Sequence, residues 1–206
     1  MRIAIVGAGN VGQALGKGWR QAGHEVSYAL RQATSNKVNA LSADGARVVA
    51  MDQASASAEV VVLAVPWPAV AAVLAGLGPL DGKILVDATN PLTAKLELAV
   101  GFDDSAGETV ARLAPGARVV KAFNTTGAEN MANARGFAVK PMMPVAGDDA
   151  TAKDAVRKLA EELGFEAVDA GPLAMSRQLE PLAVLWIKLA YAQGFGRSFA
   201  FALAQR

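Results

Sequence analysis

The sequence has no cysteine, and His24 is the one histidine among its 206 residues. Without cysteine, disulfide bonds, thiolate zinc sites and thiol nucleophiles are excluded. The 20 lysines and arginines nearly balance the 19 aspartates and glutamates, so no field of one sign attracts nucleic acid or an anionic membrane. We therefore expect a cytoplasmic protein whose partners are small molecules.

Long apolar runs are also lacking. The most apolar late segment, residues 181–187, is followed by Lys188 and falls well short of the roughly 20 residues that a membrane-spanning helix needs. The chain starts directly in a strand-like run, without the charged flank and cleavage site of a signal peptide. We therefore expect a soluble protein that begins at Met1.

Short apolar, β-branched runs alternate with helical patterns along the chain. The predicted strands are residues 3–6, 26–29, 48–50, 60–65, 84–86, 119–123, 144–146 and 167–168. This alternation predicts an α/β fold of Rossmann type, with a doubly wound, mostly parallel sheet. We assign residues 1–171 to this domain and residues 172–206 to a small helical C-terminal extension.

Three helices can be placed closely. An apolar stripe over residues 11–22 predicts the first helix, which Gly23 ends, and the same spacing predicts another from Asp148-Asp149 to Gly164. Ser105 and Glu108 form a capping-box pattern, and we assign them no further role. Residues 179–190 are apolar almost all round, so we expect this last helix to be buried on more than one side, as in a homodimer interface.

The residues from Gly7 to Gly12 read Gly-Ala-Gly-Asn-Val-Gly and fit the pattern G-x-G-x-x-G between a strand and an amphipathic helix. The first glycine allows a tight turn, Gly9 lets a pyrophosphate approach the backbone, and the third glycine lets helix and strand pack closely. The helix start at Asn10 and Val11 adds N–H donors. A glycine-rich turn without a ligand is the alternative.

The second strand lacks the acid that binds the adenosine ribose in NAD sites. It runs instead into Leu30 and Arg31, followed by polar residues and Lys37. A guanidinium can form a forked pair with a 2′-phosphate, and Lys37 can complete that pocket. The sequence therefore favours NADP(H), with an ordinary surface arginine as the alternative.

Ligands in this fold lie outside the carboxyl ends of the strands. Candidates for binding the nicotinamide and its partner therefore follow three further strands, and Met143 lies near a fourth. They are Val65, Pro66 and Asn90 for the cofactor, and Pro91, Asn124, Thr125 and Met143 for the substrate. Turn formation by the prolines and core filling by the methionine are equally compatible with the sequence.

No catalytic residue is assigned. His24 falls in a helix-to-strand turn away from the crevice, where we expect it to be solvated, and a strand-flanking lysine such as Lys121 is more often structural than a proton donor. Hydride transfer between a nicotinamide and a flavin-like ring fits a site without an acid or base, because the protein mainly sets distance and orientation.

The sequence resembles the NADPH:coenzyme F-420 (F420) oxidoreductases over nearly its whole length. The matching segments are residues 7–12, 65–66, 86–92, 119–125, 145–149, 169–172 and 179–182. The resemblance implies an NADP-binding Rossmann domain with a small C-terminal extension, direct hydride transfer to a deazaflavin lying against the nicotinamide, and homodimers. It also implies that Arg31 binds the 2′-phosphate.

The chain departs from that family at several positions. Leu30 stands where a serine or threonine is usual, Asn124 stands where the deazaflavin reductases carry a histidine, and the first turn commonly reads Gly-Thr-Gly. The Ala-Phe-Asn-Thr form is similar to bacterial relatives of unassigned substrate and to the flavin- and metal-reducing domains of membrane ferric reductases. The acceptor is therefore coenzyme F420 or FMN/FAD.

Two other functions stay open. A non-catalytic NADP(H)-binding sensor would use the same fold without chemistry. An imine or 3-hydroxyacid reductase shares the early glycine turn, but only about 35 residues follow Gly171, too few for the long helical domain that such enzymes use.

Overall fold

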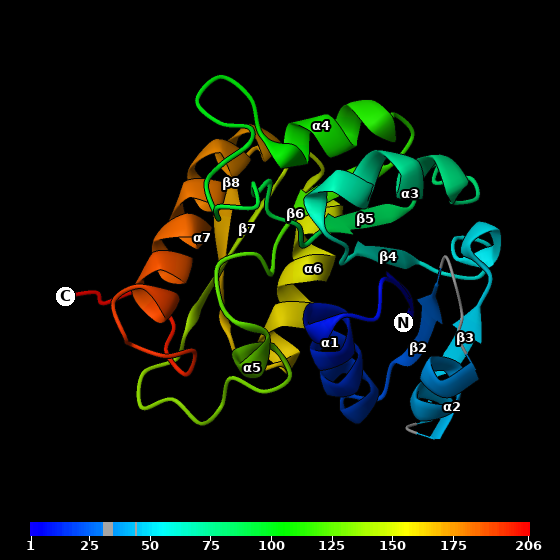
Figure 1. Ribbon diagram of the computed structural model, residues 1–206, viewed down its shortest axis with the longest axis horizontal. Helices are drawn as coiled ribbons and strands as arrows, with labels where there is room; N and C mark the ends of the chain where they lie inside the picture. The colour runs from blue at the N-terminus through cyan, green and yellow to red at the C-terminus, as the bar shows by residue number, and fades with distance from the viewer. Residues whose placement is uncertain (31–34, 44) are drawn as a thin grey trace.

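A computed structural model describes residues 1–30, 35–43 and 45–206. Its core is one sheet of eight strands in the order β3-β2-β1-β4-β5-β6-β7-β8 (Figure 1). The strands are β1 (Arg2–Val6), β2 (Glu25–Ala29), β3 (Arg47–Val49), β4 (Val60–Leu63), β5 (Ile84–Asp87), β6 (Arg118–Lys121), β7 (Met142–Gly147) and β8 (Glu166–Gly171). This Rossmann-type sheet confirms the predicted fold class.

Helices cover both faces of the sheet. They are α1 (Asn10–Gln21), α2 (Ser35–Ala43), α3 (Val70–Gly76), α4 (Ala106–Leu113), α5 (Ala128–Met131), α6 (Ala150–Glu162) and α7 (Ser176–Tyr191), with short 3-10 turns η1 (Met51–Gln53), η2 (Trp67–Ala69) and η3 (Leu173–Met175). Buried residues of α1, α5 and α6 pack on one face and those of α3 and α4 on the other. Successive residues of β1 and β4 alternate between these two clusters, as a strand covered on both faces requires.

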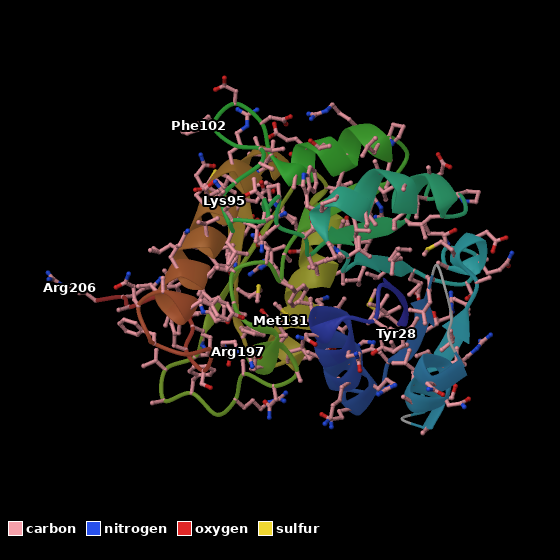
Figure 2. All side chains as sticks on the ribbon, in the orientation of Figure 1. Tyr28, Lys95, Phe102, Met131, Arg197 and Arg206 are labelled. Carbon is pink, nitrogen blue, oxygen red and sulfur yellow. The ribbon has the colours of Figure 1, made fainter. Side chains whose placement is uncertain are left out.

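The helix α1 is anchored on its buried side by Trp19. Its ring is fully buried, lies edge-on to Phe123 at 5.4 Å, and donates an indole N–H to Leu159 O of α6 at 3.0 Å. Gly16 lets α1 approach β2, because a Cβ there would collide with the hydroxyl of Tyr28. Tyr28 is visible between α1 and α2 in Figure 2.

The predicted helix ends are confirmed. Gly23 and Gly164 have φ values of +92° and +98°, the left-handed backbone that glycine adopts readily after a helix. Asp149 caps α6 by accepting the N–H of Ala152 at 2.7 Å. Ser105 caps α4 by accepting the N–H of Glu108 at 3.1 Å.

Glu108 does more than we predicted. Its carboxylate also accepts two hydrogen bonds from the Arg177 guanidinium, at 2.6 and 2.9 Å, and so ties α4 to α7. The capping pattern is local and visible in sequence, whereas this pair joins residues that are 69 positions apart.

The strand β7 reverses direction. Every other neighbouring pair in the sheet is parallel, but β6 and β7 are antiparallel, with Val120 opposite Gly147. The last residues of β7 therefore pair with the carboxyl end of β6, and β7 starts beyond that end. The pair β7 and β8 with α6 forms a parallel unit inverted relative to the rest of the sheet.

The C-terminal extension packs on the domain in two parts. The helix α7 buries one face, which includes Leu179, Ala183 and Trp186. The tail then crosses α5 and reaches β7, where Met142 N–H donates to Phe201 O at 2.8 Å. The indole of Trp186 stacks on Phe199 at 5.2 Å.

Among the described residues of one chain, α7 is buried on one face and partly exposed on the opposite face, so its expected burial on more than one side depends on a second subunit. Leu185 on that face is 49% exposed, and Pro181 is also exposed. Within the part of the chain that the structure describes, α4, η3 and the tail contact α7. A subunit interface at this face stays a prediction. Across the described ranges, no helix combines the length and apolar character needed to cross a membrane.

Candidate functional site

The strand order reverses between β1 and β4, because the chain continues from β1 outward to β2 and β3 and then returns to β4. Loops leave the carboxyl ends of these two strands in opposite directions, and ligands of open α/β sheets bind in the crevice between them. The glycine turn, residues 7–12, follows β1, and residues 64–66 follow β4.

Two of the three glycines are required by the fold itself. Gly7 has a φ of +104°, and a Cβ there would collide with Ala64 O at the end of β4. A Cβ on Gly12 would collide with Gly7 O and lie 3.1 Å from Ile5 Cγ2. These glycines let the turn pack tightly between β1, β4 and α1.

Gly9 is different, because no contact with another described residue explains it. Its backbone is extended, with φ −77°, which any residue can adopt, and a Cβ there would have no neighbour within 4 Å. A side chain at this exposed position would meet none of the described residues within 4 Å. Gly9 therefore suits the close approach of a ligand to the backbone, as the pyrophosphate of a dinucleotide requires.

The start of α1 supplies the charge that suits a phosphate. Gly9 offers no side-chain cap, and the first turn of α1 has no acidic residue. The N–H groups at Asn10, Val11 and Gly12 thus carry the positive end of the helix dipole without an acidic side chain in that turn. Asn10 is exposed and Val11 is half-buried, so the turn is accessible from outside.

The predicted 2′-phosphate site is only partly visible. Leu30 directly follows β2, is half-buried and packs against the core. Arg31 and the side chain of Lys37 lie outside the described residues, although the backbone of Lys37 belongs to α2. The assignment of these two cations to a 2′-phosphate therefore stays a prediction.

Val65 and Pro66 lie where the sequence predicts, just beyond β4 and opposite the glycine turn. Val65 is half-buried and Pro66 is exposed. Pro66 precedes η2 and so redirects the chain away from the crevice. Its role as a turn former is evident, and its contact with a cofactor stays a prediction.

Asn90 and Asn124 form a reciprocal pair where the segments after β5 and β6 meet. Asn90 Nδ2 donates to the backbone oxygen of Asn124 at 2.9 Å, and Asn124 Nδ2 donates to Asn90 Oδ1 at 3.1 Å. Asn124 Nδ2 also donates to Leu179 O in α7 at 3.1 Å. The two backbone oxygens accept only, so they fix which way each amide points.

The remaining oxygen of this pair is notable. Asn124 is 4% exposed, and its Oδ1 is buried without a hydrogen-bond partner among the described residues. A buried polar acceptor of this kind is normally satisfied by a donor. The amide therefore has capacity to accept one N–H or O–H more.

The backbone just before Asn124 is strained. Phe123 is fully buried and has a φ of +60°, a left-handed conformation that is a genuine outlier for a bulky residue. Its N–H lies 3.2 Å from the sulfur of Met143, which is fully buried in the core. Strain of this type costs about 1–3 kcal/mol and persists where surrounding packing imposes it. Phe123 thus sets the direction in which Asn124 leaves the strand.

Met143 consequently supports the site from within the core, and its side chain does not line an accessible surface. The other two predicted substrate residues are also mostly enclosed. Pro91 is buried and its oxygen accepts the Ala99 N–H at 2.7 Å, while Thr125 is 2% exposed. Both lie directly beside the asparagine pair in sequence, and their contact with a substrate stays a prediction.

A buried ion cluster lies beneath the asparagine pair. Lys121 is fully buried and its Nζ contacts Asp87 Oδ2 at 2.9 Å, Glu180 Oε1 at 2.9 Å and Thr89 O at 2.7 Å. These three acceptors match the three N–H bonds of an ammonium group. Lys121 is therefore structural, as the sequence favoured, and has no proton donor left for a ligand.

The two acids of the cluster are equally well partnered. Asp87 Oδ1 accepts the N–H and the hydroxyl of Thr89 at 2.9 and 2.7 Å. Glu180 accepts the backbone N–H groups of Ala106 and Gly107, at the first turn of α4, at 3.0 and 3.1 Å. Burial raises the pKa of Glu180, and the Lys121 ammonium partly opposes that rise. The first turn of α4 further stabilises the ionised acid.

His24 lies away from this crevice, near the amino end of β2, as expected. It is partnered rather than simply solvated: Nε2 is 2.6 Å from Glu162 Oε2, and Nδ1 is 3.0 Å from the amino group of Met1. The contact fastens the end of α6 to the start of β2. A catalytic role for His24 at the crevice is excluded by this location.

The roles of Asp87 and Glu180 were not predicted from the sequence. Glu180 did carry a signal, because a single acid within an otherwise apolar helical segment must be paired if it is buried. Asp87 directly follows the apolar residues 84–86 of a central strand, where a charge also needs a partner. That Lys121 satisfies both acids depends on the docking of α7, which the sequence does not reveal.

The strand order, the glycine turn and the uncapped start of α1 define a dinucleotide-binding protein of Rossmann type. Residues 2–91 match the family described as NADP oxidoreductase, coenzyme F420-dependent. The chain is 33% identical to the F420-dependent NADP reductase of Methanothermobacter thermautotrophicus, over 92% of this chain and 89% of that protein. It belongs to this family, as the sequence indicated.

A second curated relative is the metalloreductase STEAP3 of Rattus norvegicus, which is 31% identical over 89% of this chain. The chain spans only 37% of the length of that protein. The similarity therefore concerns one part of the metalloreductase.

Solved structures confirm the architecture. A chain from Arthrobacter sp. FB24, provisionally described as an F420-dependent NADP reductase, has a TM-score of 0.91 and 33% identity, with both chains covered completely. The imine reductase of Aspergillus terreus, solved with NADPH4, has a TM-score of 0.69 at 24% identity, covering 94% of this chain and 63% of that one. This second likeness concerns the fold alone.

Proposed function

We propose that the protein is an NADP(H)-dependent oxidoreductase that transfers a hydride between NADPH and a flavin-like acceptor, either coenzyme F420 or FMN/FAD. The main support for the proposal is that the ionisable side chains beside the site are buried and paired with each other. Asp87 and Lys121, at the ends of β5 and β6, are fully buried and paired, so neither is available to protonate a carbonyl or imine substrate. A reaction between two rings does not require such a group.

The residues present fit a dinucleotide. The open backbone at Gly9 and the first N–H groups of α1 would hold the pyrophosphate, and Arg31 with Lys37 would hold the 2′-phosphate. Asn90 is half-buried and would orient the nicotinamide end. When bound, NADPH supplies the two electrons and the proton of the hydride, and a reduced deazaflavin or flavin takes its further proton from solvent.

The asparagine pair also fits a ring substrate. Asn124 Oδ1 lacks a partner among the described residues, and Asn90 Nδ2 donates one of its two N–H bonds within the pair. The nicotinamide carboxamide and the flavin and deazaflavin rings each carry an N–H group that would satisfy such an oxygen. The role of the protein in this proposal is to hold two rings at a fixed distance and orientation.

Purified protein mixed with NADPH and, in turn, F420, FMN and FAD tests the proposal through the loss of nicotinamide absorbance. We expect turnover with at least one of the three. NADPH binding without turnover by any acceptor would favour a non-catalytic sensor. Turnover of a cyclic imine in their place would favour an imine reductase, the alternative that the short C-terminal extension opposes.

We further propose a homodimer formed through the outward face of α7. Leu185 is 49% exposed there, and a second copy of the chain would cover it. Light scattering of the purified protein measures the mass, and the change Leu185→Glu is expected to convert a dimer to a monomer. A wild-type monomer would contradict this assembly.

We place the reaction in the cytoplasm, where a protein without cysteine needs no oxidising compartment.

A further inference from the structure

Beside the site, side-chain hydrogen bonds and an ion pair link seven residues into a closed loop, in which two of the links are between neighbours in the chain. We name this loop the buried circuit. Its members are Asp87, Thr89, Asn90, Lys121, Asn124, Leu179 and Glu180. Lys121 donates to Thr89 O, and Thr89 is the neighbour of Asn90. Asn90 pairs with Asn124, which donates to Leu179 O, and Leu179 is the neighbour of Glu180. Glu180 returns the loop to Lys121.

The buried circuit joins the ends of two paired strands, β5 and β6, to α7. Thr89 and Asn90 follow β5, Lys121 and Asn124 belong to β6 and its extension, and Glu180 lies in α7. Glu180 also holds the first turn of α4 through Gly107. That contact is close, because a Cβ on Gly107 would collide with the Ser176 hydroxyl at the start of α7.

The charges of the buried circuit do not balance. One ammonium faces two carboxylates, so the cluster carries one excess negative charge when both acids are ionised. The side chains of Lys121, Asp87 and Glu180 are 0%, 0% and 1% exposed. Buried ionic clusters of this kind are weak contributors to net stability, and the best attested reason to keep one is that it specifies a single arrangement.

We propose that Lys121 is a positioning residue, which together with Asp87 and Glu180 fixes the Asn90–Asn124 pair in one orientation for the ring-to-ring reaction. The inference rests on the proposed function. Lys121 contacts no ligand directly, because its three N–H bonds point to protein acceptors. It acts through the Thr89 backbone and through Glu180, the neighbour of Leu179.

Glu180→Gln tests this role without removing a side chain. An amide cannot replace a carboxylate that accepts two backbone N–H groups and an ammonium, so the circuit loosens while its volume is kept. Misplacement near a reacting centre costs about tenfold to a hundredfold in kcat. We expect that loss in kcat, with the NADPH dissociation constant changed by less than about threefold, because the glycine turn is untouched.

Glu108→Gln is the matched control. It makes the same change of acid to amide and also breaks an ion pair between α4 and α7, but Glu108 lies outside the buried circuit. We expect its kcat to stay within about twofold of the wild type. A folded Glu180→Gln protein whose kcat matches that of Glu108→Gln would overturn the proposal.

A milder change keeps the test decisive if Glu180→Gln fails to fold. Thr89→Val removes one hydroxyl hydrogen bond to Asp87 and leaves every charge in place. We expect a smaller loss of kcat in the same direction, without a change in NADPH affinity. Wild-type kcat in Thr89→Val would count against positioning and leave the cluster a purely structural element.

A second measurement separates this proposal from the proposed acceptor. If the wild-type protein turns over none of F420, FMN and FAD, the proposed reaction fails, but NADPH binding can still be followed by the fluorescence of its nicotinamide ring. Loss of positioning changes the emission of bound NADPH in Glu180→Gln and not in Glu108→Gln. Identical emission from both variants would overturn the positioning role itself.

Discussion

The glycine turn and the buried circuit lie at the same edge of the sheet and are built in opposite ways. The glycine turn occupies six consecutive residues and works through backbone geometry, with Gly9 leaving room for a ligand. The buried circuit depends on side chains from distant segments, such as Asn90 and Asn124, which are 34 residues apart. The difference teaches that one edge of one fold can combine a locally encoded element with one that exists only after the whole chain has folded.

Among our predictions, replacing Lys121, the cation of the buried circuit, should have the largest effect, and this effect is on the stability of the fold. Lys121→Met leaves two buried carboxylates without their ammonium, and breaking a buried ion pair in this way costs about 3–5 kcal/mol. We expect the free energy of unfolding in urea to fall by that amount. The control Lys83→Met removes a half-buried lysine that donates to Ala58 O at 2.8 Å, and should cost only about 1 kcal/mol. Equal losses would show that the buried circuit has no special energetic status.

The cofactor preference gives the next largest effect, at the opposite side of the site. Arg31→Ala should weaken NADPH binding by about 1.5–3 kcal/mol, the contribution of a charged hydrogen bond, and leave NADH binding almost unchanged. Titration of both cofactors against the variant measures the difference. Equal losses for NADPH and NADH would remove the 2′-phosphate assignment.

Two matched substitutions in the glycine turn separate its structural role from its role in cofactor binding. Gly12→Ala forces a Cβ against Gly7 O and should cost about 1–3 kcal/mol of stability. Gly9→Ala meets no atom of the described residues within 4 Å, so its cost to the fold should not exceed about 1 kcal/mol, while NADPH binding weakens clearly. Thermal unfolding and NADPH titration distinguish the two. Wild-type NADPH affinity in Gly9→Ala would mean that no phosphate approaches that backbone.

The smallest expected effect concerns the ion pair outside the buried circuit. Hydrogen bonds from Arg177 lower the pKa of Glu108 below its ordinary 4.5, so the ionised acid stabilises the folded state above about pH 4.5. That contribution, up to about 1 kcal/mol, is lost as the pH falls through the lowered value. The stability difference between wild type and Glu108→Gln should therefore shrink in acid. A difference that grows on acidification would contradict this sign.

The sequence was sufficient for the elements whose signals are local. The eight strands, the turn at Gly7 and the cap at Asp149 were all predicted, because periodicity, glycine spacing and capping chemistry act within a few residues. The reversal of β7 was not predicted, since an apolar run does not reveal the direction in which it pairs. The buried circuit also escaped prediction, because the partner of Glu180 lies 59 residues away, at Lys121.

The inverted strand has an electrostatic consequence. Because β7 runs against β6, the helix that follows it, α6, begins at the sheet edge opposite to the start of α1, near Arg118. Asp149 places a carboxylate on the positive end of α6, while the positive end of α1 has no acid in its first turn. Two helices of similar size thus direct their dipoles to opposite ends of the molecule, and of these two helix starts that of α1 is the one without a capping acid. The fold itself therefore gives an approaching dinucleotide a preferred side from which to arrive.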